Sequence, residues 1–315
     1  MSMKNIARPL MLLAAAMIWG FAFVAQDAAS AVPSFALGFT RSIFAFAFLL
    51  TVIPVSDLLT KNGRRLISKR GIDFSKNELI GGIITGIILA AASALQQIGI
   101  SAGTDGGKAG FITALYVVLV PIYSLLLKKK TRLNVWISIL IAAAGFYLLC
   151  IKDNFSVAPS DLIVMGGSII FPIHILAIDR FSPRCDGIRM SAIQFLTCSV
   201  VNLILSLTVE MPLDIGQIFT HLPSLIYLGI MSSGVAYTLQ IVGQKNVNPT
   251  VASIILSLES VFAVIGTALF LGQTLTTREY IGCAVVLVAV ILSQIDFSKL
   301  KKASTTNTEP PQSEG

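Results

Sequence analysis

Long apolar blocks alternate with short polar segments along almost the whole chain. An apolar helix of about 20 residues is long enough to cross the ~30 Å hydrocarbon core of a bilayer. Ten blocks have this character, and the pattern therefore predicts ten transmembrane helices, at residues 9–27, 33–56, 78–99, 108–127, 134–151, 159–179, 190–209, 222–244, 249–271 and 277–295.

The composition supports a membrane protein. Hydrophobic residues make up 55% of the 315-residue chain and charged residues only 12%, whereas soluble domains carry about 25% charged residues. The mean hydropathy is +0.82. The four cysteines, Cys150, Cys185, Cys198 and Cys283, are scattered without a close pair, so neither a disulfide framework, a metal site nor a bound cofactor is indicated.

Basic residues gather in alternate connections, and this orients the predicted helices. With ten spans both termini lie on one side, and 19 of the 23 Lys and Arg residues fall in the tails and loops of that side. Because short loops rich in Lys and Arg stay in the cytoplasm, both termini are predicted to be cytoplasmic. Orientation and contact with anionic lipid thus explain the net charge of +7 without a nucleic-acid partner. The polar tail 298–315 is predicted to be disordered.

The two halves of the chain resemble each other. Residues 94–120 align without a gap with residues 237–263 at an offset of 143, which places Gln97 on Gln240 and Tyr116 on Glu259. Earlier in the chain the offset is about 152. Because each half has five spans, an odd number, the second half enters the membrane from the opposite side. Such an inverted repeat is typical of alternating-access transporters, whose site lies between the halves; the alternative is chance alignment of two hydrophobic segments.

Several sequence motifs occur in an order that identifies a known family. They read AMIWGFAFVAQ in the first span, FTRSIFAFAFLL in the second, GKAGFITALYVVLVP in the fourth and NPTVASIILSLESVFAVIGTALFLGQTLTTREYIG across the last two. The chain resembles the EamA family of the drug/metabolite transporter superfamily from about residue 10 to 295. One departure is Gln273, where the family usually has a glutamate.

This resemblance implies an all-α membrane protein of ten transmembrane helices in two inverted five-helix repeats. We expect the first repeat at 1–152, the second at 153–297 and the tail at 298–315. The family implies a secondary transporter, not an enzyme, that moves a small metabolite or amino acid across the bacterial cytoplasmic membrane, in most members by export or exchange. The family motifs indicate the fold and not the cargo.

Glu259 is a carboxylate within an otherwise apolar predicted helix. A charge at the bilayer centre costs about 2.5–3.5 kcal/mol on insertion scales, so it rarely faces lipid. Residues at helical spacing from Glu259 are small (Ala252, Ala263 and Gly266), and small residues line helix contacts. Glu259 is therefore expected to face the protein interior, with Tyr116 opposite it.

The other polar and aromatic residues within spans complete the candidate solute and proton pathway. Gln97 follows a stripe of small residues that includes Gly82 and Gly86, and its repeat counterpart Gln240 follows a similar stripe. Both are predicted to face inward. At an offset of 153, Gln194 corresponds to Arg41, the one basic residue well inside a span. The remaining candidates are Trp19, His174 and Tyr237.

Each candidate has a structural alternative. Gln and His side chains can act only as interhelical hydrogen bonds, Arg41 can extend outward to the surface, and Trp19, Tyr116 and Tyr237 can be packing residues. In the functional interpretation, Glu259 either exchanges a proton, because removal from water favours the neutral acid, or holds a substrate ammonium group. Arg41 would then bind a substrate carboxylate.

Two other classes of protein compete with a transporter. A membrane-embedded enzyme would need a nucleophile and base or a metal cluster, but the chain has no HExxH or GxSxG motif and only two histidines, His174 and His221. A sensor or scaffold that moves no solute would need a sizeable soluble module, and the longest loop, 57–77, has only about 20 residues.

Overall fold

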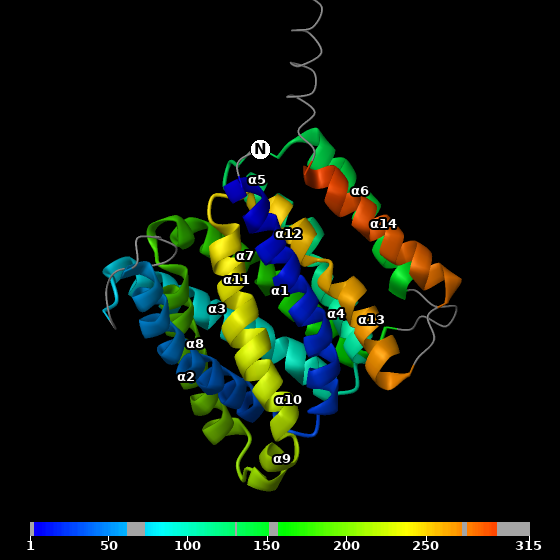
Figure 1. The fold of residues 1–315 in the computed structure, drawn as a ribbon. Helices are drawn as coiled ribbons and strands as arrows, with labels where there is room; N and C mark the ends of the chain where they lie inside the picture. Colours follow the sequence, from blue (N-terminus) through cyan, green and yellow to red (C-terminus); the bar gives the residue numbers. More distant parts are fainter. Residues whose placement is uncertain (1–2, 62–72, 130, 151–156, 273–275, 295–315) are drawn as a thin grey trace, which may run out of the picture.

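Every regular element in the described part of the chain is a helix (Figure 1). The structure is a computed structural model that describes residues 3–61, 73–129, 131–150, 157–272 and 276–294. Its first half contains α1 (Met3–Ala28), α2 (Ser34–Lys61), α3 (Lys76–Ser101), α4 (Gly106–Ala114), α5 (Tyr116–Leu126) and α6 (Leu133–Cys150). The second half contains α7 (Pro159–Phe181), η1 (Ser182–Arg184), α8 (Gly187–Val209), α9 (Ile215–Thr220), α10 (Leu222–Ile226), η2 (Tyr227–Ala236), α11 (Tyr237–Gln244), α12 (Pro249–Leu256), α13 (Glu259–Leu271) and α14 (Thr277–Gln294).

The ten predicted spans are confirmed. Nine helical segments of the described chain are long and apolar enough to cross a membrane, and the fifth predicted span is the shorter apolar helix Leu133–Leu149. Residue 273 and the tail 298–315, for which we made predictions, lie outside the described residues. The short helix α9 is a feature that hydropathy did not predict, within the connection before the eighth span.

Two of the spans are broken in the middle. The fourth span consists of α4 and α5, which meet at Leu115, and the ninth consists of α12 and α13, which meet at Ser257 and Leu258. At each break the backbone tightens: Leu115 N donates to Ile112 O at 3.3 Å, and Leu258 N donates to Ile255 O at 3.2 Å. Both bonds span three residues where an α-helix spans four.

Local backbone features recur at the offset of 143 that the sequence predicted. Gly103 and Asn246 both have positive φ, 107° and 59°. Two residues further on, Asp105 caps the N-terminus of α4 and Asn248 caps that of α12. The broken helices thus begin in the same way and break at the same place in both halves, which agrees with a two-repeat fold.

Helix contacts follow the same pseudo-symmetry. A Cβ atom on Gly86 of α3 would lie 2.6 Å from both Gln194 O and Thr197 Cβ on α8, and one on Gly229 of η2 would lie 2.5 Å from Phe44 Cβ and 3.1 Å from Arg41 O on α2. These contacts relate Gln194 to Arg41 at the predicted offset of 153. Small residues let each pair of helices approach this closely.

The bundle has a central group of helices and a peripheral pair. Helix α1 lies against α13, η2 and α11, while α3 lies against α7 and α8. Helices α6 and α14 stand together at one side of the bundle (Figure 1). We call the end where α1 begins and α14 ends the N-terminal end; α9 lies at the opposite end (Figure 1). Ion pairs join the α4–α5 segment to α7 at both ends: Lys108 Nζ is 2.5 Å from Asp161 Oδ2, and Lys129 pairs with Asp179.

Candidate functional site

A small cavity lies where the two broken helices meet. Tyr116 is the eleventh of 21 residues in the fourth span, and Glu259 is the eleventh of 22 in the ninth. Each is the first residue after the break, at the N-terminus of α5 and α13 respectively. Both side chains line the cavity, so the breaks carry the two repeat-related side chains to one place at mid-depth.

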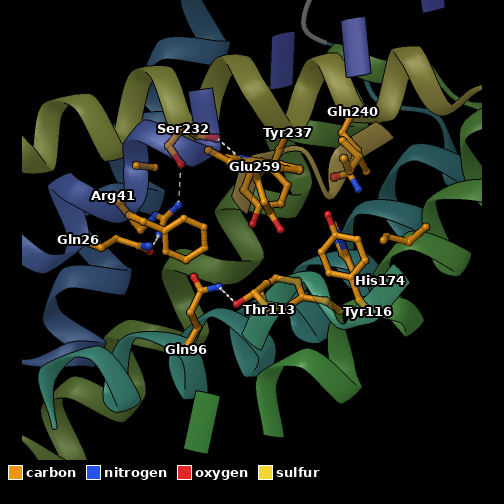
Figure 2. A pocket seen from close by; sticks show the side chains of 16 residues that line it. Gln26, Arg41, Gln96, Thr113, Tyr116, His174, Ser232, Tyr237, Gln240 and Glu259 are labelled. Carbon is orange, nitrogen blue, oxygen red and sulfur yellow. Dashed lines mark hydrogen bonds between the residues drawn. The ribbon is translucent and has the colours of Figure 1, made fainter. Parts of the chain in front are cut away.

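The cavity is about 40 Å³ in volume. One water needs roughly 10–15 Å³ on this measure, so the space holds about three waters and is smaller than an amino acid. In this conformation the site has no room for a metabolite. Its polar lining is shown in Figure 2; the lining residues come from both halves, in helices α1, α2, α3, α4, α5, α7, η2, α11, α12 and α13.

Seven of the nine candidate residues predicted from the sequence line this cavity. They are Trp19, Arg41, Tyr116, His174, Tyr237, Gln240 and Glu259. The other two, Gln97 and Gln194, do not line it. Gln194 lies behind His174, with its Oε1 at 3.1 Å from His174 Nε2.

Gln96, and not Gln97, reaches the cavity from α3. Gln96 Nε2 donates to Thr113 Oγ1 at 2.8 Å across the lining, whereas Gln97 Nε2 donates to Ser101 Oγ of its own helix at 3.4 Å. The stripe of small residues that pointed to Gln97 includes Gly82 and Gly86, which face Ile193 and Thr197 of α8. The stripe thus marks a helix contact, because small residues allow close approach, and the cavity lies on the neighbouring face.

Arg41 is a buried guanidinium whose hydrogen-bond partners are neutral. It is 8% exposed, and it donates through Nε to Ser233 Oγ at 3.0 Å, through Nη1 to Gln26 Oε1 at 3.0 Å and through Nη2 to Ser232 Oγ at 3.1 Å. These bonds hold the side chain in the interior, so it does not extend to the surface. None of them supplies a negative charge to balance the guanidinium.

The serines that hold Arg41 come from an unusual segment. Ser232 and Ser233 lie in η2, a π-helix of ten residues, a conformation that is rare and frequent at functional sites. In this segment the hydroxyls of the adjacent residues Ser232 and Ser233 both accept hydrogen bonds from the Arg41 guanidinium. Trp19 Nε1 also donates to Ser232 O at 3.1 Å, which ties α1 to the same segment. Sequence reasoning missed Gln26 and Ser232, although both are polar residues within predicted spans.

Glu259 is 4% exposed, and its Oε1 atom accepts no hydrogen bond from any described residue. Oε1 of Gln240 is likewise buried without a partner there. The hydroxyl of Tyr116, 3% exposed, lies near enough to the Glu259 carboxylate to interact with it. Because buried polar atoms in native proteins are bonded to protein or water, the open oxygens of Glu259 and Gln240 are places where a solute or water can bind.

Aromatic rings enclose the cavity beside these polar groups. The ring centroid of Tyr237 is 4.5 Å from that of Trp19, 5.8 Å from that of His174 and 5.5 Å from that of Phe195. In Figure 2, Arg41 and Gln26 lie on one side of the lining, and Gln240 and His174 lie on the other. The site thus offers a buried cation, a buried carboxylate and aromatic surface around one space. Among the described residues, no group of three or more His, Cys, Asp or Glu side chains is placed to hold a metal ion.

Comparison with known proteins agrees with this architecture. The sequence model of the EamA-like transporter family matches residues 8–151 and again residues 158–294. An "Uncharacterized transporter" of Archaeoglobus fulgidus is 27% identical over 291 residues, which cover 92% of this chain and 86% of the relative. The "Uncharacterized inner membrane transporter YedA" of Escherichia coli K12 is 27% identical over 290 residues, 89% of this chain and 88% of the relative.

A solved crystal structure has the same fold. It superposes with a TM-score of 0.72 at 16% sequence identity, and the match covers 93% of this chain and 98% of that one. At this identity the likeness concerns the arrangement of helices alone.

Proposed function

Because the chain belongs to the EamA-like transporter family, we propose that this membrane transporter carries a small metabolite or amino acid across the bacterial cytoplasmic membrane by alternating access, in the direction of export. The observation that carries the proposal is the site at the two helix breaks. It lies at mid-depth between two inverted repeats, where alternating-access carriers bind their solutes.

The solute that suits this site has groups of both charges. Arg41 has three neutral partners, and a guanidinium binds a carboxylate through parallel hydrogen bonds. Glu259 has an open oxygen, to which an ammonium group or a proton can bind. Trp19 and Tyr237 offer ring faces that attract a cation or cover an apolar side chain.

Glu259 has two possible roles within this function. In the first it is the coupling group, which takes a proton on one side of the membrane and releases it on the other. In the second it stays ionised and holds the ammonium group of the solute. The roles differ in whether transport follows a proton gradient, which makes them separable by experiment.

The proposal also includes the membrane, the orientation and the division of the chain. The E. coli relative is named an inner membrane transporter. The excess of basic residues in the loops on the side of the termini supports a cytoplasmic position of both termini under the positive-inside rule. The two family matches, 8–151 and 158–294, suit repeats at 1–152 and 153–297, followed by the tail 298–315.

A solute screen with the purified protein in liposomes tests the function. Labelled amino acids and other small amphiphilic metabolites are offered with and without an imposed pH gradient, and counterflow of each solute is recorded. We expect counterflow of at least one zwitterionic solute above protein-free liposomes. A sensor, scaffold or enzyme would move no solute, so absence of counterflow across the whole screen would contradict the proposal.

A further inference from the structure

Five buried polar side chains lie between the cavity and the N-terminal end of the bundle, each with an atom that lacks a hydrogen-bond partner in the described structure. The atoms are Oε1 of Gln240 and Gln244 and the hydroxyls of Ser124, Ser182 and Thr250. None of the five residues is more than 2% exposed. Because native proteins rarely leave buried polar atoms without protein or water partners, several such atoms in one region indicate a place where water binds. We call these five the inner polar residues.

The inner polar residues come from neighbouring helices. Gln240 and Gln244 lie on α11, Ser124 on α5, Thr250 on α12, and Ser182 directly after α7. Helix α7 contacts α5, α11 and α12, and α5 also contacts α12. The four helices that carry the inner polar residues are therefore connected through α7.

The row begins at the cavity itself. Gln240 lines the cavity, and Gln244 lies one turn further along the same helix face. Gln244 Nε2 donates to Ile175 O of α7 at 2.7 Å, which fixes the side chain between the two helices while its Oε1 stays open. Open polar positions therefore continue from the cavity toward the N-terminal end.

The opposite half of the bundle differs at the equivalent positions. The repeat offsets relate the inner polar residues to Gln97, Ser101, Thr267, Ser30 and Gly107. Thr267 donates to Ala263 O at 2.9 Å, Ser101 accepts from Gln97 and Ser34, Ser30 is partly exposed and Gly107 has no side chain. Of these five, only Gln97 has a buried atom without a partner, although the hydroxyl of Ser206 on α8 is a further one in this half.

We propose that the inner polar residues line a water path that connects Glu259 with the N-terminal end of the bundle. In the proposed orientation this end faces the cytoplasm, so the site communicates with cytoplasmic water. A proton taken up by Glu259 would come from this water and return to it. The role of Glu259 in this inference rests on the proposed function, whereas the existence of the water path does not.

Accessibility of single cysteines tests the path. In a background where the four native cysteines are replaced, Ser124→Cys, Ser182→Cys and Thr250→Cys each place a thiol of similar size on the path. Thr85→Cys is a matched control, because Thr85 is also fully buried but its hydroxyl donates to Gly81 O at 2.7 Å.

Each variant is exposed to Ag⁺, a thiol-binding ion about as small as a water molecule, in vesicles of known orientation, scored by protease access to a C-terminal tag. Thiols that remain unbound are then alkylated after unfolding. We expect the three path cysteines to react at least about tenfold faster than Thr85→Cys, and only from the face that carries the tag, because a thiol reacts as its water-exposed thiolate. Reaction no faster than that of Thr85→Cys, or reaction from the opposite face, would overturn the path.

Removal of the hydroxyls gives an independent measurement if a cysteine variant does not fold. Ser124→Ala and Thr250→Val delete an open hydroxyl each. If the hydroxyl binds water, its removal breaks a hydrogen bond, so the melting temperature should stay equal or fall. If the hydroxyl is dry and unpaired, its removal should raise the melting temperature. A raised melting temperature in both variants would contradict the path. Neither measurement involves transport, so a failed counterflow screen would leave their outcome unchanged.

Discussion

Tyr116 and Glu259 occupy the same position in the two repeats: each is the first residue after the break of a discontinuous transmembrane helix. Both face one cavity, where the Tyr116 hydroxyl lies near enough to the Glu259 carboxylate to interact with it. The symmetry of the fold therefore brings together two chemically different groups, a phenol and a carboxylic acid. Only one of them can carry a negative charge near neutral pH, which gives the site its asymmetry.

Replacement of this carboxylate should abolish gradient-driven transport. In Glu259→Gln the amide keeps the size of the side chain but cannot take up or release a proton. We expect the accumulation of solute that an imposed pH gradient drives to fall by at least about tenfold. The measurement uses the solute found in the liposome screen. Retained exchange of labelled for unlabelled solute would assign coupling to Glu259, whereas loss of exchange would assign substrate binding. Unchanged accumulation and exchange would contradict both roles.

Arg41 should be intolerant even of lysine. A lysine keeps the positive charge, but its compact ammonium lacks the planar fork that reaches Gln26, Ser232 and Ser233 together. We expect Arg41→Lys to raise the KM for a carboxylate-bearing solute by roughly tenfold, since a charge-assisted bond contributes about 1.5–3 kcal/mol. The matched measurement uses an analogue of the solute that lacks the carboxylate and competes for transport. The concentration of this analogue needed for half-inhibition should be nearly the same in Arg41→Lys and in the wild type. Equal weakening of both solutes would rule out carboxylate recognition.

The contact between α1 and α13 should not accept a side chain at Gly20. A Cβ atom there would lie 2.3 Å from Phe262 Cβ and 2.7 Å from Glu259 O, so the helices would have to separate. We expect Gly20→Ala to destabilise the protein by about 1–3 kcal/mol, the usual effect of overfilling a well-packed interior, with a lower melting temperature in detergent.

Gly166→Ala on α7 provides the control for this glycine. Its added Cβ would come no closer than 3.4 Å to Leu95 Cδ1, an ordinary contact distance. The melting temperature of Gly166→Ala should therefore stay near that of the wild type. If the two variants melted alike, the close approach of α1 to α13 would not be a determinant of stability.

The thiol of Cys185 should react slowly in spite of its position in a connection between helices. Burial, and next the negative charge of Glu78, raise the pKa of Cys185 from 9.0 to about 11. The thiolate is the reacting form, so a shift of this size lowers its fraction about hundredfold near pH 8. Alkylation of a variant that keeps only Cys185 should be correspondingly slower than that of a free thiol, and should accelerate up to about pH 11. A rate equal to that of a free thiol would contradict this environment.

The spans could be predicted from the sequence because hydropathy alone determines which segments suit a bilayer. The breaks at Leu115 and Leu258 could not. Leucine is a good helix former, and the prolines nearest the two breaks, Pro121 and Pro249, do not lie at either of them. The repeat alignment already pairs the two leucines, but only the backbone shows that both helices break there.

The candidate site was predictable in part for a similar reason. Charged residues such as Glu259 and Arg41 are costly in lipid, so their presence within spans indicates an interior position without further knowledge. Glutamine is less costly, and helical spacing alone could not separate the cavity face of α3 from the face that contacts α8. This explains why Gln97 was selected and Gln96, its neighbour, was missed.

The small volume of the cavity has a consequence for the time course of binding. A solute larger than about three waters can enter only after the helices around the site separate, because the cavity in this conformation measures about 40 Å³. Its observed association rate should therefore stop rising with concentration once opening becomes the slow step, as expected when binding follows a conformational change. The plateau would report how often the protein opens, and it would be the same for every solute that the site accepts.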